Sequence, residues 1–158
     1  MNFKILSLAV LLPLTFTDVN AQTGKVSRVR KVTSFKPPVV TTKLDDAGTK
    51  GNISAVQAGK LIGDSLIVTD AKKNRYMVTS YQFLYKRKST AEDQETGARK
   101  IVFTTLSDIF KTTPLPAMWV DKIKREIKSD EELHFFDIIV QDANNRRFFA
   151  PELKFKIQ

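Results

Sequence analysis

Cysteine is absent from this chain of 158 residues, and histidine and tryptophan occur once each. Without cysteine, no disulfide can cross-link the fold, no lipid can be attached through a thioether, and a zinc site would have neither thiolates nor a second histidine. Stability must therefore come from an apolar core. Hydrophobic residues make up 42% of the chain and include 11 phenylalanines, which is ample for the core of one domain.

Residue sets typical of enzymes are also missing. A serine-histidine-aspartate triad would need His134, yet no Gly-x-Ser-x-Gly motif presents a serine. Asp108, Asp137 and Glu152 are candidates for a carboxylate pair in glycoside hydrolysis, but their spacing brings no two of them together. The sequence also has no glycine-rich phosphate loop. We therefore predict a non-enzymatic protein with no catalytic residue, cofactor or metal.

The first 21 residues resemble a secretory signal peptide. A basic start at Lys4 is followed by an apolar stretch from Ile5 to Phe16, and small residues lead to a cleavage site after Ala21. The apolar stretch is shorter than the ~20 residues that span a bilayer as a helix. We expect export to the periplasm of a Gram-negative bacterium or to its exterior, with no transmembrane segment in the mature chain. An uncleaved membrane anchor is the alternative.

Residues 22–50 form a basic segment for which the sequence predicts little regular structure. Its valines are spaced by three among lysines and arginines, a pattern that favours neither helix nor strand. Pro37 and Pro38 then interrupt any regular element. Whether this segment packs on the following domain, which we place at residues 51–158, is left open.

The first half of that domain contains a short helix and two strands. Ser54 and Gln57 make a capping box, and Gly59 is positioned to end the resulting turn or two of helix. Residues 65–69 read as a strand and residues 70–74 as its turn. The next strand, 75–86, is the longest: alternation places Met77, Tyr81, Phe83 and Tyr85 on one side and Tyr76, Val78 and Leu84 on the other.

The middle of the domain alternates polar and apolar stretches. Residues 88–97 are predicted to be a polar loop, residues 101–103 a strand, and residues 106–116 an irregular or briefly helical connection. An amphipathic helix follows at about residues 117–128, because Trp119, Ile123 and Ile127 recur every four residues among charged ones.

The final third closes the domain. Residues 133–140 are almost continuously apolar, as in a strand covered on both faces, with Asp137 as the one charge. Residues 141–145 supply turn residues that tolerate left-handed backbone, and residues 153–157 alternate apolar and polar side chains. The total is five to seven short strands with one proper helix, so we predict a mainly β, sandwich-like fold.

Four segments carry a resemblance to a known family: Gly51–Ala55, Tyr76–Phe83, the helix leading into Leu133–Val140, and Pro151–Ile157. Together they resemble the C-terminal domain of the GldM/PorM family of gliding motility and type IX secretion. The resemblance covers about the last two-thirds of the chain. It implies a small immunoglobulin-like β-sandwich that contacts an envelope protein partner of the outer-membrane ring, and full-length relatives that are dimeric, so a homodimer is a further candidate. It implies no catalytic residue.

The net charge offers an alternative function. Lysine and arginine number 26 against 17 acidic residues, which gives +9 and favours anionic partners. Nucleic acid is not expected, because the chain is predicted to be exported and no nucleic-acid motif interleaves its basic residues with stacking aromatics. An anionic glycan or other anionic envelope surface would be contacted by three clusters: Arg28, Arg30 and Lys31; Lys86, Arg87 and Lys88; and Arg146 and Arg147. Solvated surface charge is the plainer interpretation of these clusters.

Overall fold

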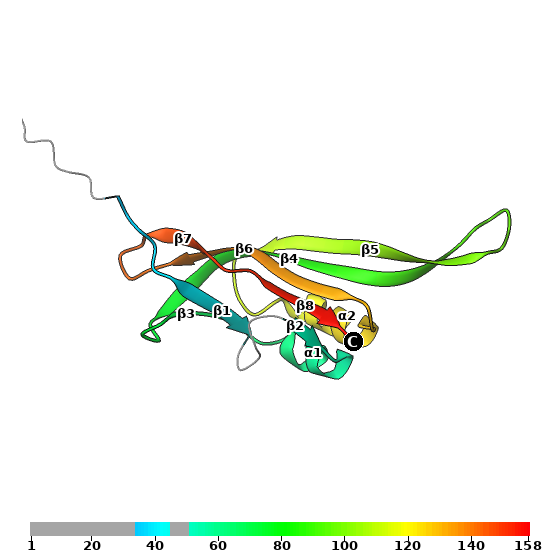
Figure 1. The fold of residues 1–158 in the computed structure, drawn as a ribbon, viewed down its shortest axis with the longest axis horizontal. Coiled ribbons are helices and arrows are strands. Elements are labelled where there is room, and N and C mark those ends of the chain that lie inside the picture. The colour runs from blue at the N-terminus through cyan, green and yellow to red at the C-terminus, as the bar shows by residue number, and fades with distance from the viewer. Residues whose placement is uncertain (1–33, 45–50) are drawn as a thin grey trace, which may run out of the picture. The chain divides into compact units, whose positions relative to one another are not determined.

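The computed structural model describes residues 34–44 and 51–158 (Figure 1). The predicted signal peptide, residues 1–21, and most of the basic segment, 22–50, lie outside the described residues. In chain order the elements are β1 (Val40–Leu44), β2 (Gly51–Ile53), α1 (Ala55–Leu61), β3 (Leu66–Asp70), β4 (Arg75–Glu92), β5 (Arg99–Phe110), α2 (Ala117–Glu126), β6 (Glu132–Gln141), β7 (Arg147–Ala150) and β8 (Leu153–Ile157).

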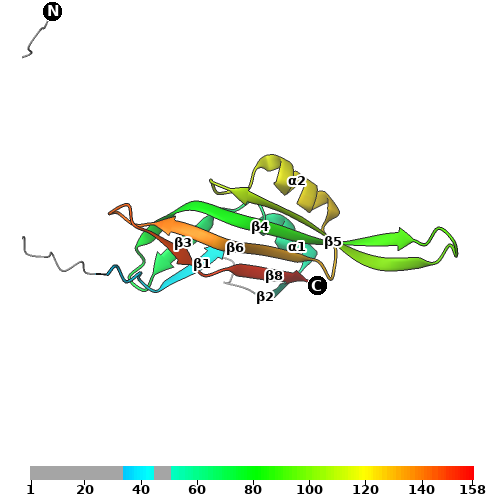
Figure 2. The same ribbon diagram turned by 90° about the horizontal axis from the view of Figure 1, so that it is seen from above.

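The strands form a single mixed, curled sheet. Its order is β1-β3-β4-β6-β8-β2, with β5 paired to β4 and β7 paired to β6 (Figures 1 and 2). All pairs are antiparallel except β2 with β8. The mainly β prediction is confirmed. The immunoglobulin-like sandwich is not confirmed, because the eight described strands connect through hydrogen bonds into one sheet instead of two separate layers.

Two helices cover one face of the sheet, which we call the inner face; the sequence predicted one proper helix and a turn or two of helix after Ser54. The second, α2, has nearly the expected bounds and buries Val120 and Ile123. The Ser54 hydroxyl accepts from the Gln57 amide and the Gln57 side chain accepts from the Ser54 amide, so the predicted capping box is confirmed at α1. Gly59 lies inside α1 and does not end it, because the helix continues to Leu61.

The core lies between the inner face and the helices. Aromatic side chains dominate it: the Trp119 ring meets the rings of Phe83 and Phe110 edge-on, at centroid distances of 5.7 and 5.6 Å. The final strand shows the predicted alternation, with Leu153, Phe155 and Ile157 buried and the lysines between them exposed. Burial of these side chains supplies the main stabilisation of a chain without disulfides.

The predicted facing of β4 is wrong at three of its first residues, Tyr76, Met77 and Val78. Tyr81, Phe83 and Tyr85 are buried on the inner face, but Met77 is 62% exposed on the other. The β4–β6 register shifts between Val78 and Ser80, so one extra residue enters β4 there and reverses the alternation. Tyr76 and Val78, predicted on the opposite side, therefore pack against the same core.

Strand β6 carries the compensating irregularity. A second register shift lies between the pairs Ser80–Ile139 and Gln82–Phe136, so one extra residue enters β6 there. Asp137, which lies in this irregular stretch, has a φ of 47°. The strand was predicted to be covered on both faces. In fact Leu133, Phe135, Ile138 and Val140 are buried, whereas the residues between them face outward and are at least partly exposed. The outer face of the sheet, opposite the helices, is therefore open to solvent.

Half of the predicted polar loop at residues 88–97 is strand: Lys88–Glu92 belong to β4, and residues 93–97 form the turn before β5. Strands β4 and β5 stay paired without a register shift from Tyr81 opposite Phe110 to Glu92 opposite Arg99. The predicted irregular connection is likewise strand as far as Phe110. Beyond Lys86, β4 has no partner among the described strands except β5, and this hairpin extends past the end of β6 (Figures 1 and 2). We call residues 87–104 the arm.

Part of the predicted weakly ordered segment belongs to the sheet. Residues Val40–Leu44 form β1, which pairs with β3, and both Val40 and Leu44 are buried. The compact unit accordingly spans Lys36–Gln158, starting earlier than residue 51. The remainder of residues 22–50 is described only at 34–39.

Candidate functional site

The carboxylates considered for catalysis do not converge. His134 lies on the outer face, where its Nε2 is 2.9 Å from Glu152 Oε2. Asp137, at the β6 bulge, accepts a hydrogen bond of 2.8 Å from the Gln82 amide group. Asp108 lies on the inner face, because it is paired with the buried Phe83. Within residues 34–44 and 51–158, no three histidine or acidic side chains are grouped to hold a metal ion.

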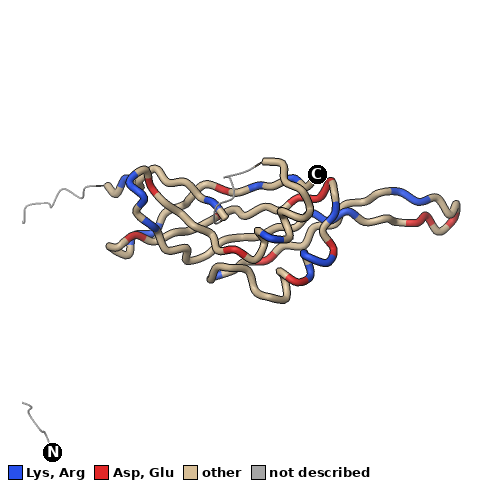
Figure 3. The backbone as a smooth tube through the Cα atoms, turned by 90° about the horizontal axis from the view of Figure 1, so that it is seen from below, with Lys and Arg blue, Asp and Glu red and all other residues tan. Residues whose placement is uncertain are grey.

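The predicted basic clusters do not form one surface. Arg28, Arg30 and Lys31 lie outside the described residues. Lys86 is paired with Glu132 at one end of the β4–β6 ladder, whereas Arg147 pairs with Gln141, which in turn pairs with Met77 at the other end. Figure 3 shows lysine and arginine, in blue, scattered along the chain among acidic residues in red. Met77 and Lys86 are nine positions apart on β4, which corresponds to about 30 Å at roughly 3.4 Å per residue.

The three side chains of the second cluster, Lys86, Arg87 and Lys88, are each paired with a carboxylate. The Lys86, Arg87 and Lys88 nitrogens lie 3.6, 2.9 and 2.8 Å from oxygens of Glu132, Glu126 and Asp130 respectively. In the turn between β6 and β7, Arg146 Nη2 lies 2.7 Å from Asp142 Oδ2. These pairs are partly exposed and locally balance the charges of Lys86, Arg87, Lys88 and Arg146, so these four residues offer little uncompensated charge to an anionic surface.

Ion pairing sets the pKa values of the carboxylates near this end. A hydrogen bond from the Lys154 ammonium lowers the pKa of Glu132, although partial burial opposes the shift. The ammonium of Lys88 lowers the pKa of Asp130 in the same way. Both carboxylates therefore hold their charge at pH values where an unpaired one would begin to protonate.

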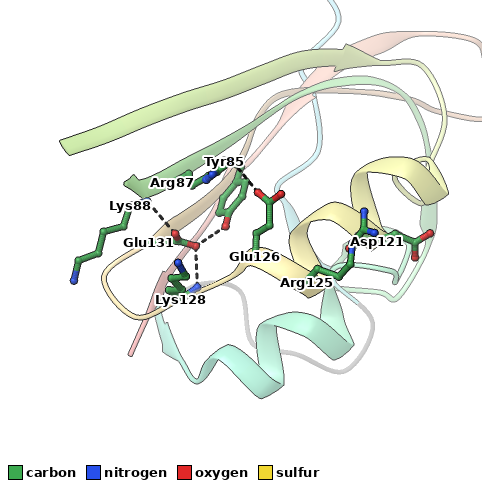
Figure 4. Close-up of polar contacts among 8 residues, drawn as sticks. All are labelled: Tyr85, Arg87, Lys88, Asp121, Arg125, Glu126, Lys128 and Glu131. Carbon is green, nitrogen blue, oxygen red and sulfur yellow. Dashed lines mark hydrogen bonds and ion pairs between the residues drawn. The ribbon is translucent and has the colours of Figure 1, made fainter. Parts of the chain in front are cut away.

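A buried carboxylate joins the arm to the body of the domain. Glu131 is 0% exposed, and its side chain accepts hydrogen bonds from the Tyr85 hydroxyl and from the backbone amides of Lys88 and Lys128, at 2.5, 2.9 and 2.9 Å (Figure 4). Burial, together with this contact, raises the pKa of Tyr85. Three donors satisfy the charge, as a buried carboxylate requires. Nearby, the Arg87–Glu126 ion pair ties the arm to the end of α2.

Exposed apolar side chains gather on the outer face around the bulge. A shallow depression of about 300 Å³ is lined by Ile109, Ile139 and Phe149 together with Ser80, Tyr81, Gln82 and Asp137. Ile109 is 62% exposed and Phe149 is 70% exposed. We call Ile109, Asp137, Ile139 and Phe149 the outer-face patch.

Strand pairing brings the members of this patch together. Ile109 on β5 is opposite Gln82 on β4, and Phe149 on β7 is opposite Ile139 on β6. The positive φ of Asp137 turns its carboxylate toward Gln82 and leaves the depression beside it. The patch can therefore offer an apolar contact surface with a hydrogen-bonded polar pair at its centre.

Sequence reasoning missed this patch, although one signal for it was present. Phe148 and Phe149 are consecutive, and consecutive residues of a strand point to opposite faces, so only one of the two can be in the core. Phe148 is buried and Phe149 is exposed. The position of Ile109 could not have been found in the same way, because residues 106–110 were not predicted to be a strand.

Comparison with known proteins leaves the family open. No known protein family matches the chain, and no curated protein matches it significantly. Among residues 34–44 and 51–158, neither helix has the length and hydropathy that crossing a lipid bilayer requires. What the fold defines is a mainly β domain with one helix-covered face and one open face.

Proposed function

We propose that this chain is an exported, non-enzymatic interaction or accessory module of the bacterial envelope that binds a protein partner, like the ring-contacting domain of the GldM/PorM family. The observation that carries the proposal is the outer-face patch. Large apolar side chains that are more than half exposed and line one depression on a sheet face mark a protein contact surface better than a reaction site.

The export step of this proposal rests on residues 1–21 and on the family resemblance. The curled sheet with α1 and α2 on its inner face is, on this proposal, the counterpart of the immunoglobulin-like domain of that family. Binding of an anionic glycan is less well supported, because the described basic clusters lie at opposite ends of the sheet and are paired with carboxylates.

The test compares two charge-introducing variants at equally exposed apolar positions. Phe149→Asp alters the outer-face patch, and Val56→Asp alters α1 on the other side of the sheet, where Val56 is 71% exposed against 70% for Phe149. Each purified protein is cross-linked to envelope fractions of the host bacterium. We expect wild type and Val56→Asp to capture the same partner, and Phe149→Asp to lose it.

Two results would count against this function. Equal capture by both variants would remove the patch from the interaction. Retention of wild-type protein on a polyanionic glycan column, with release as salt is raised, would favour the glycan alternative, because only an electrostatic contact weakens strongly with ionic strength.

A further inference from the structure

Strand β5 has one edge without a partner in the described part of the chain. It pairs with β4 over its whole length, and no other described strand pairs with it. A free edge presents a row of backbone N–H and C=O groups that can hydrogen-bond another extended chain. The edge of β5 can therefore bind another extended segment through backbone hydrogen bonds.

The middle of this edge lacks the features that usually protect such strands. Residues Ile101–Leu106 contain no charged residue and no proline, and the β4–β5 register has no bulge across its twelve pairs. Natural proteins commonly place lysine, proline or a bulge on a long exposed edge to prevent pairing. Their absence from Ile101–Leu106 indicates that this stretch of the edge is kept available for pairing.

A groove runs beside the edge on the inner face. It has a volume of about 300 Å³ and is lined by Leu106 and Asp108 of β5 and by Met118, Trp119 and Lys122 of α2. Met118 is 75% exposed, whereas Trp119 is half-buried. The groove therefore has an apolar floor with one acidic and one basic side chain.

Helix α2 runs antiparallel to β5 along this groove. The Trp119 ring lies against Phe110 near the end of β5. At the other end of the helix, Glu126 is paired with Arg87, whose strand partner is Thr104. Figure 2 shows α2 beside the β5 edge of the sheet. A strand added to β5 would lie between the two elements, with every second side chain over the groove.

We propose that the β5 edge and the α2 groove together bind an extended, acidic segment of a partner protein. The segment pairs with β5 through its backbone and inserts an apolar side chain between Leu106 and Met118. Recognition of this kind obtains affinity from main-chain hydrogen bonds and specificity from pockets for alternate side chains.

Charge complementarity selects an acidic segment. Lys100, Lys111 and Lys122 lie on β5, just after it and in the groove, and none has an ion-pair partner within residues 34–44 and 51–158. The basic N-terminal part of this same chain, with Arg28, Arg30 and Lys31, is electrostatically mismatched to them. A second copy would bring another β5 that begins with Arg99 and Lys100.

The inference deepens the proposed function, because it names a second surface and the form of the segment that occupies it. The groove lies on the inner face and the outer-face patch on the opposite one, so the two surfaces can be altered separately. Loss of one contact leaves the other measurable.

A phage-displayed library of random twelve-residue peptides, selected on the immobilised full-length protein, tests the inference. We expect enriched peptides that alternate apolar and acidic residues. For a synthetic copy of the strongest peptide, Met118→Glu and Lys122→Glu should each weaken binding by about tenfold or more, as removal of an anchor does. Binding should also slow hydrogen exchange of amides along β5.

Matched controls separate local from general effects. Val56→Glu makes the change of Met118→Glu at a similarly exposed residue of α1, and Lys124→Glu repeats the charge reversal on the side of α2 that faces α1. Both should leave the affinity within about twofold of wild type, as surface changes outside a contact usually do.

Four results would overturn the inference. In the first, no peptide is enriched, and in the second, the groove and control variants bind the peptide equally well. In the third, the peptide binds only after residues 1–33 are removed. In the fourth, the protein is a dimer that Met118→Glu dissociates. The last two would assign the groove to this chain's own N-terminal part or to a second copy. If Met118→Glu still captures the envelope partner while Phe149→Asp does not, the proposed function stands without the groove.

Discussion

Replacing Glu131 with alanine removes the acceptor of three hydrogen bonds in the interior of the domain. The Tyr85 hydroxyl and the amides of Lys88 and Lys128 would each lose a charged partner, and Glu131 is 0% exposed, so water does not reach the site without rearrangement. Hydrogen bonds to charged groups contribute about 1.5–3 kcal/mol each, and the recovered hydration of the carboxylate offsets part of their sum. We expect a loss of about 3–5 kcal/mol, typical of breaking a buried ionic contact.

A loss of this size is easily measured. Domains of this kind are stable by about 5–15 kcal/mol, and for about 120 residues the melting temperature falls by roughly 4 °C per kcal/mol. Urea titration followed by fluorescence of Trp119, the only tryptophan, reports unfolding because its ring packs on Phe83 and Phe110. The melting temperature should drop by about 12–20 °C.

Two companion variants make the result specific. Glu152→Ala removes an exposed carboxylate that contacts the His134 ring, and its effect should stay below about 1 kcal/mol. Tyr85→Phe removes one of the three donors and should cost about 2 kcal/mol, with much of that cost absent when Glu131 is already alanine. A Glu131→Ala protein within about 1 kcal/mol of wild type would refute the argument that this carboxylate joins the arm to the body.

Three further outcomes follow from the structure. Asp137→Val should destabilise the domain by about 1–3 kcal/mol, because a β-branched residue is strained at a φ of 47°. Asp137→Gly should change the free energy of unfolding by less than about 1 kcal/mol. Urea titration compares the two variants, and equal effects would contradict a backbone cause. Because the folded pKa of Glu132 is lowered, its stabilisation is complete above the unfolded value of about 4.3 and is lost as pH falls through the folded value. Lys154→Met should therefore flatten the loss of stability below about pH 4.5, and an unchanged acid profile would remove this pair as its source. Replacing residues 90–101 with a two-residue turn should leave the urea midpoint nearly unchanged, since these residues pair only with each other, and a large fall would mean that the arm supports the core.

The elements predicted correctly are those encoded by neighbouring residues. The α1 capping box, the four-residue spacing in α2, the turn after β6 and the alternation of β8 each depend on residues a few positions apart. Asn145, with a φ of 61°, adopts the left-handed backbone expected in that turn. Such signals can be recognised in the sequence before the fold is known, because the interacting residues lie only a few positions apart.

The errors arose where a distant strand decided the outcome. The polar stretch at residues 88–97 is predicted from the sequence to be a loop, but Lys88–Glu92 belong to β4, pair with β5 and form part of the arm. Polarity indicates exposure, and an exposed hairpin is as polar as a loop. The bulges at Thr79 and Asp137 depend on each other across β4 and β6, so alternation within one strand did not reveal them.

Both proposed contact surfaces are products of strand pairing. The outer-face patch needs β5, β6 and β7 aligned in register, and the groove needs α2 beside the free edge of β5. The residues involved lie up to 40 positions apart in the chain, from Ile109 to Phe149. Their apolar character is evident in the sequence, but it is the same character that marks a core residue.

Composition and local pattern were enough to establish a mainly β domain without disulfides, the location of its helix α2 and the inward and outward residues of its last strand. The tertiary structure decided which apolar side chains remain exposed, because burial depends on whether another layer covers a face. The type of a residue does not reveal whether such a layer is present. It also decided that the charged clusters lie apart, since their separation is set by strand register.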